Sequence, residues 1–73
     1  MGRLAGFRYR EIAARLRRFG FVPSGKAKGS HEGWVNVETK RLTVVPRHSG
    51  DMPEGTLRAI LQQAGIAIDD FLA

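Results

Sequence analysis

The sequence predicts an α+β fold: a helix, three antiparallel strands and a second helix, with both helices on one face of the sheet. Two segments with helical periodicity flank a stretch of short, partly β-branched segments, and this order favours that fold. Seventy-three residues are enough for one hydrophobic core, so we expect a single domain over residues 1–73. A sheet that is covered on one side only leaves its other face open to a partner.

The first helix is expected over residues 9–19. Its apolar residues recur three and four positions apart and share one face: Tyr9, Ile12, Ala13, Leu16 and Phe19. No Ser, Thr, Asp or Asn stands at the expected N-cap, so we expect this end to be poorly fixed. Gly20 stands where a left-handed residue ends a helix, and Phe21 can pack back on the last turn. Leu4 and Phe7 are available to pack under the helix.

Three strands are expected over residues 21–28, 31–37 and 42–45. Pro23 and Gly25 restrict the first to a sheet edge or a bulge, and Pro46 ends the third. Alternation places the side chains of the second strand on two faces, with His31, Val35 and Val37 on one and Glu32, Trp34 and Asn36 on the other. Alternation alone does not tell which face meets the helices.

The second helix is the clearest element of the chain. Its apolar stripe consists of Leu57, Ile60, Leu61 and Ala64. Gly65 predicts its end, with Ile66 packing after the cap. Asp51, with Glu54 three residues later, resembles a capping box at the start, and Thr56 is a rival N-cap. Residues 67–73 can add a short turn that closes the edge of the core.

Composition excludes several classes of site. The chain has no cysteine, which excludes disulfides and thiolate zinc sites, and its two histidines lie seventeen positions apart, a poor spacing for metal ligands. We therefore expect no metal and no small-molecule cofactor. The chain lacks an apolar run long enough to span a membrane and a signal-peptide pattern, so we expect a soluble, cytoplasmic protein.

The charge of the chain is unevenly distributed. Residues 1–48 hold eleven basic and three acidic side chains, a balance of +8, whereas residues 49–73 have a balance of −3. This positive field favours a polyanion such as nucleic acid, or an acidic protein, over a neutral small molecule. A solvated, arginine-rich helix face is the alternative explanation.

Histidine chemistry on RNA is the catalytic hypothesis that the residues support. The chain contains no serine-nucleophile motif, phosphate loop or paired carboxylates suited to a sugar. RNA carries its own nucleophile, the 2′-hydroxyl, and an imidazole, whose usual pKa is about 6.5, can accept its proton. His31 is the better candidate because it follows Lys28-Gly29-Ser30, where the glycine lets a phosphate approach the backbone and the lysine can hold it. An ordinary polar residue at a strand start is the alternative.

Other basic and polar residues are candidate RNA contacts. They are Lys26, Lys28, Ser30, Arg41, Arg47 and His48. Taken singly, such a side chain is more often solvated than a ligand. His48 could be a second acid or a phosphate contact, but plain surface is the leading interpretation for it. Trp34 is suited either to stacking on a base or to core packing.

Four segments, in order, resemble the HicA family of bacterial toxin ribonucleases over residues 4–72. They are Phe19-Gly20-Phe21, Lys28-Gly29-Ser30-His31-Glu32, Val45-Pro46-Arg47-His48 and Gly55-Thr56-Leu57-Arg58-Ala59-Ile60-Leu61-Gln62-Gln63-Ala64-Gly65-Ile66. The resemblance implies a double-stranded-RNA-binding-domain-like α-β-β-β-α fold and a metal-independent endoribonuclease, or mRNA interferase, with His31 catalytic. It also implies that a HicB-type antitoxin covers the site. Glu32 follows His31 where many relatives have a second histidine, and strand alternation turns Glu32 away from His31.

Two other functions fit the same residues. One is a non-catalytic RNA-binding module with the same fold, since layout and charge do not require cleavage. The other is a protein-interaction domain whose basic face serves only an acidic partner; salt-sensitive binding to RNA would count against it.

Overall fold

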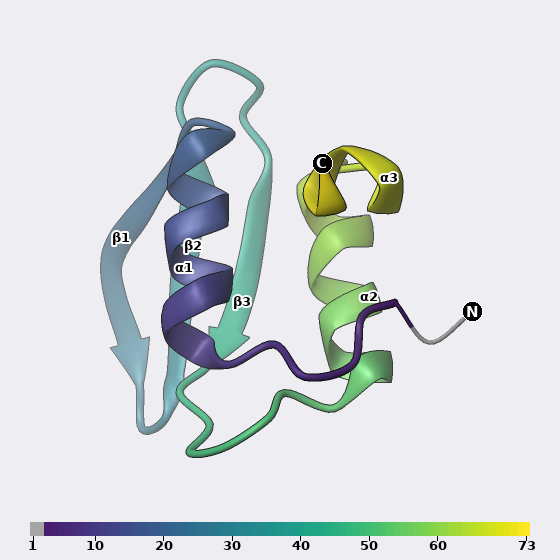
Figure 1. Ribbon diagram of the computed structural model, residues 1–73. Helices are drawn as coiled ribbons and strands as arrows, with labels where there is room; N and C mark the ends of the chain where they lie inside the picture. The colour runs from purple at the N-terminus through teal and green to yellow at the C-terminus, as the bar shows by residue number, and fades with distance from the viewer. Residues whose placement is uncertain (1–2) are drawn as a thin grey trace.

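The predicted order of elements is confirmed. The structure, a computed structural model, describes residues 3–73, apart from the side chains of Lys26 and Ala27. Its elements are α1 (Tyr9–Arg18), β1 (Phe21–Lys28), β2 (His31–Asn36), β3 (Leu42–Pro46), α2 (Glu54–Ala64) and α3 (Ile68–Leu72). The strands form one antiparallel sheet in the order β1-β2-β3. Figure 1 shows α1 in front of β2, between β1 and β3, with α2 running alongside β3.

Burial decides which face of the sheet meets the helices. Trp34 and Asn36 of β2 are buried, as are Thr43 and Val45 of β3. His31 shares the opposite face and is exposed. The buried apolar residues form one core: Leu4, Ile12, Leu16, Phe21, Trp34, Val45, Met52, Leu57, Ile60, Leu61, Ala64, Ile66 and Phe71. The helices therefore cover the Trp34 face, and the His31 face is open.

The start of α1 is better fixed than the sequence predicts. Arg8 is the N-cap, and its backbone N–H donates to the carboxylate of Glu11 at 3.0 Å. We expected a poorly fixed end because the N-cap residue is not one of the usual capping types. The acceptor for the N-cap N–H comes instead from Glu11, at the third helical position. At the other end Gly20 adopts φ 90°, and the side-chain amide of Asn36 donates to the carbonyl of Phe19 at 3.0 Å.

The predicted N-caps of α2 are wrong. The helix begins at Glu54 after Pro53, whose carbonyl accepts the N–H of Leu57 at 3.0 Å. Asp51 forms a backbone bridge with Arg8, and its carboxylate lies 3.8 Å from Arg8 Nε. Asp51 therefore faces the start of α1 instead of capping α2. This tertiary contact leaves no trace in the local sequence.

The end of α2 follows the prediction. Gly65 has φ 73°, and its N–H donates to the carbonyl of Gln62 at 3.2 Å. The N–H of Ile66 donates to the carbonyl of Leu61 at 3.0 Å. These two bonds make a Schellman motif, in which the left-handed glycine lets the chain turn back onto the helix.

Two further sequence expectations are confirmed. The pairing of β1 with β2 shifts register between Pro23 and Ala27, and Gly25 has φ 81°, as expected for a bulge. The segment before α1 also packs into the fold. Leu4 is buried, and the rings of Phe7 and Phe71 meet edge to face with centroids 5.1 Å apart.

Candidate nucleic-acid interface

His31 begins β2 on the open face of the sheet. It pairs with Lys28 of β1 and with Pro46 of β3, so these three residues form one cross-strand row. The row borders a hollow of about 700 Å³, which is lined by Ser24, Lys28, His31, Gly33, Val35, Leu42 and Val44. The imidazole thus stands with a lysine at one end of a hollow in the open sheet face.

Much of the rest of this hollow is apolar. Val22, Val35 and Leu42 are partners across the three strands and form a second row. Leu42 and Val44 are 58% and 45% exposed. Exposed apolar side chains that lie next to one another are typical of surfaces that bind a partner. We call this surface, made of Val22, Val35, Leu42 and Val44, the apolar row face.

The turn before His31 is open on its outer side. Gly29 has φ 65°, and a Cβ built there would meet nothing within 4 Å. The carbonyl of Ser30 accepts the N–H of Arg47 at 2.6 Å, which fixes the chain leaving β3 against the turn. Ser30, His31 and Arg47 therefore meet at one end of the sheet.

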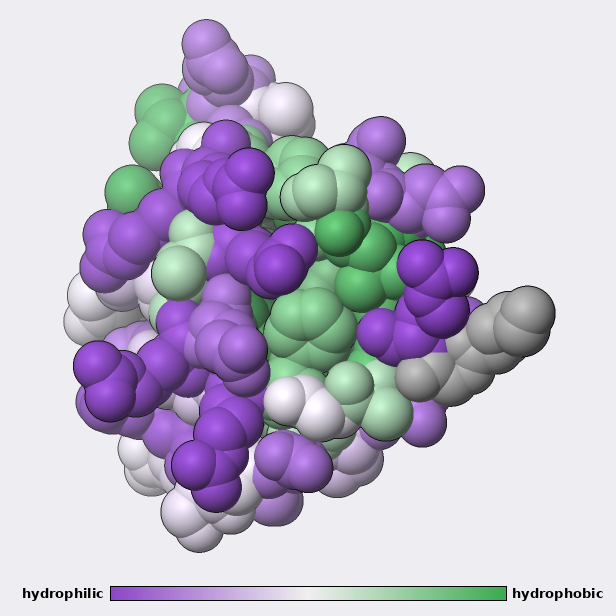
Figure 2. Space-filling view, viewed as in Figure 1, coloured by the Kyte–Doolittle hydropathy of each residue, from purple (hydrophilic) through white to green (hydrophobic). Residues whose placement is uncertain are grey.

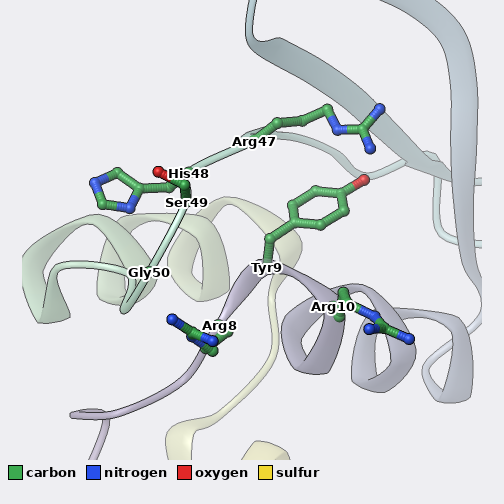
Figure 3. A pocket seen from close by; sticks show the side chains of 7 residues that line it. All are labelled: Arg8, Tyr9, Arg10, Arg47, His48, Ser49 and Gly50. Carbon is green, nitrogen blue, oxygen red and sulfur yellow. The ribbon is translucent and has the colours of Figure 1, made fainter.

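Arg47 and His48 reach the other side of that end. They line a second hollow, of about 440 Å³, at the start of α1, together with Arg8, Tyr9, Arg10, Ser49 and Gly50 (Figure 3). The Arg47 guanidinium carbon lies 5.1 Å from the centroid of the Tyr9 ring, a cation–π distance. The predicted RNA contacts Arg47 and His48 thus lie near His31 in the fold but line a separate hollow.

Arg41 does not lie at the end of the sheet that holds His31. It precedes β3, five residues before Pro46, which corresponds to about 16 Å of extended strand. Its Nη1 lies 3.4 Å from the carbonyl of Gln63 near the end of α2. The side chain of Lys26 lies outside the described residues. Of the predicted contacts, Lys28, Ser30, Arg47 and His48 are therefore the ones gathered around the His31 end.

Glu32 points away from His31, as alternation predicts. Its Oε1 accepts hydrogen bonds from the Tyr9 hydroxyl and, at 3.1 Å, from Trp34 Nε1. Trp34 is 1% exposed, so core packing is the correct explanation of this residue and base stacking is excluded. The Arg17 guanidinium carbon lies 5.3 Å from the Trp34 ring centroid. Glu32 thus links α1 to β2 on the helix side of the sheet.

This contact changes the acidity of Tyr9. Burial raises the pKa of the Tyr9 phenol above its usual value, and the hydrogen bond to Glu32 and the charge of Glu32 raise it further. The nearby Arg47 and Arg17 act in the opposite direction. The phenol therefore remains a hydrogen-bond donor at neutral pH.

The sequence did not predict that Arg8, Tyr9 and Arg10 would line a hollow together with Arg47 and His48. Helical periodicity placed Tyr9 on the apolar face of the predicted helix and the arginines elsewhere on its surface. An aromatic residue between two arginines at the start of a helix was the available signal, but nothing in the sequence showed that Arg47 and His48 would lie beside it. Across the described part of the chain, no helix is long and apolar enough to cross a membrane. That same part contains no group of three or more His, Cys, Asp or Glu side chains suited to a metal ion.

The fold and the match to a protein-family model together define the class of protein, a toxin of a bacterial toxin–antitoxin system. The matching model is described as the HicA toxin of bacterial toxin-antitoxin, and it covers residues 9–66. The chain therefore belongs to the HicA toxin family, which confirms the resemblance seen in the sequence, and membership implies an antitoxin partner. No curated protein matches the chain.

Proposed function

We propose that this toxin is an endoribonuclease that cleaves mRNA, with His31 as the group that moves the proton. The observation that carries the proposal is the position of His31: exposed, beside Lys28, at the end of an open hollow and next to a turn that admits a close ligand. The positive net charge of residues 1–48 favours a polyanionic substrate.

The chemistry needs only groups that the site, the RNA and the solvent supply. The imidazole accepts the proton of a 2′-hydroxyl, the 2′ oxygen forms a bond to the adjacent phosphorus, and the bond from phosphorus to the 5′ oxygen breaks. The leaving 5′ oxygen takes a proton from solvent, so the products end in a 2′,3′-cyclic phosphate and a 5′-hydroxyl. Lys28 stabilises the negative charge that develops on the phosphate oxygens.

The apolar row face supports a second part of the proposal. A HicB-type antitoxin covers this face and with it His31, so that inhibition is direct occlusion of the substrate. Exposed apolar side chains next to a basic rim suit a protein with an apolar patch bordered by acidic groups. Such an antitoxin is expected to compete with RNA instead of binding alongside it.

The direct test is the rate of RNA cleavage by His31→Ala. General acid–base help is worth roughly 10² to 10⁴-fold, so the variant should lose at least about 100-fold in rate. Because His31 is exposed, its removal should leave the fold intact, which circular dichroism checks. His48→Ala removes the same side chain from the other hollow and should lose less than about tenfold. A folded His31→Ala protein with full activity would refute the proposal, and RNA binding without any cleavage would favour the non-catalytic module.

A further inference from the structure

Basic side chains line the second hollow, and the proposed cleavage step does not use them. Four basic side chains surround Tyr9: Arg47 extends across its ring, Arg8 and His48 lie toward one side, and Arg10 leaves the first turn of α1 toward the other (Figure 3). All four are exposed. Hydrophilic side chains also gather over α1 on the helix side of the molecule (Figure 2). The hollow shares no lining residue with the hollow of the apolar row face, so the two are separate parts of the surface.

Three carboxylates lie near the hollow, but none of them lines it. Asp51 lies 3.8 Å from Arg8, and both side chains are about two-thirds exposed, so this pair is weak. Glu11 accepts the backbone N–H of Arg8, and Glu32 accepts the hydroxyl of Tyr9 on the inner side. The positive end of the α1 dipole adds to the field at the hollow. An anion inside the hollow would therefore face the basic side chains that line it, with these carboxylates lying behind them.

We propose that this hollow binds the phosphates of the RNA strand outside the scissile bond, so that the substrate passes around the end of the sheet. The Ser30–Arg47 hydrogen bond joins the His31 turn to the wall of the hollow, so one strand can contact both. This inference rests on RNA being the substrate, as proposed above. It adds Arg8 and Arg10 to the substrate-binding residues.

The arrangement of the cations favours a nucleic-acid backbone over an acidic side chain of a protein. The basic groups lie on both sides of Tyr9 instead of converging on one point (Figure 3). A strand presents successive phosphates and can use both sides at once, whereas one carboxylate can use only one.

The test is equilibrium binding of a fully 2′-O-methylated RNA of twelve nucleotides, which lacks the 2′-hydroxyl nucleophile. The double variant Arg8→Gln/Arg10→Gln is compared with Arg18→Gln/Arg58→Gln, which removes the same charge from exposed positions that do not line the hollow. Fluorescence anisotropy at several KCl concentrations gives the dissociation constant and its salt dependence. Thermal unfolding shows that each variant is folded.

The Arg8→Gln/Arg10→Gln variant should bind the methylated RNA at least about tenfold more weakly than the wild type does. The slope of log K against log salt should fall by about 1.4, at about 0.7 for each lost phosphate contact to a single strand. The control should change binding by less than about threefold. Equal losses in both double variants, or no RNA binding by the wild type, would overturn the assignment. So would unchanged RNA affinity with weakened antitoxin binding, which would assign the hollow to the protein partner.

The outcome is separate from that of the cleavage proposal. Binding through Arg8 and Arg10 by a protein that cleaves no RNA would refute the nuclease and leave the phosphate site intact. Cleavage by a protein whose RNA affinity does not depend on these arginines would refute the phosphate site alone.

Discussion

Removing the carboxylate of Glu32 should destabilise the fold strongly, although this residue stands next to the proposed catalytic histidine. Glu32→Ala leaves the Tyr9 hydroxyl and Trp34 Nε1 without their shared acceptor. Hydrogen bonds to charged groups contribute about 1.5–3 kcal/mol each. Because both bonds are only partly buried, we take the lower value for each and expect a loss of about 3 kcal/mol. A chain of this length has about 4–11 kcal/mol in total.

Urea unfolding measures this loss directly, because Trp34 is the one tryptophan of the chain and its fluorescence reports its burial. With an m-value near 1 kcal/mol/M, the midpoint should fall by about 3 M. Circular dichroism at 222 nm provides a second probe that does not depend on Trp34. Coincident transitions from the two probes would support two-state unfolding.

Two control variants separate the hydrogen bonds from charge alone. Glu38→Ala removes an exposed carboxylate beyond β2 and should change stability by less than about 0.5 kcal/mol. Glu32→Gln keeps an acceptor but removes its charge, so it should lose about half as much as Glu32→Ala. Equal stability of Glu32→Ala and Glu38→Ala would refute the reasoning. Folded Glu32→Gln should also retain RNA cleavage, because this side chain faces away from His31.

Two further predictions concern the ends of helices. Tyr9→Phe should lose about 1.5 kcal/mol at neutral pH. Because the folded-state pKa of Tyr9 is raised, the stabilisation is complete below the unfolded value of 10.0 and is lost as pH rises through the folded value. The stability difference between wild type and Tyr9→Phe should therefore shrink above about pH 10 in urea titrations; a constant difference would contradict the assignment. Gly65→Ala should cost about 1 kcal/mol or more, because φ is 73° and the new Cβ would lie 3.0 Å from the Arg41 guanidinium. The control Gly55→Ala, within α2 with nothing within 4 Å of the new Cβ, should gain about 0.5 kcal/mol; urea unfolding measures both glycine variants.

Local sequence signals predicted the elements of the fold well. The apolar stripe that ends at Gly65 gave the end of α2, because a left-handed glycine and the following Ile66 form a local motif. The bulge near Gly25 was also predictable, since Pro23 limits regular pairing. In contrast, the start of α2 was mispredicted because Asp51 is engaged by Arg8, which lies more than forty positions away in the sequence.

The surroundings of the proposed site required the three-dimensional structure. Alternation placed His31 and Glu32 on opposite faces, but only burial showed that His31 lies on the open one. The candidate contacts Arg41 and Arg47 flank β3, and the strand length between them separates the two. Arg47 lies against the Tyr9 ring because of the path that the chain takes after β3. No local sequence pattern predicts that path.

The most direct test of the central claim is the chemistry of the 3′ ends made from a long single-stranded RNA in EDTA by wild type and His31→Ala. Attack by the 2′-hydroxyl predicts fragments from the wild type only, each ending in a 2′,3′-cyclic phosphate or its 3′-phosphate hydrolysis product. Fragments with 3′-hydroxyl ends, or the same fragments from folded His31→Ala, would contradict the role proposed for His31.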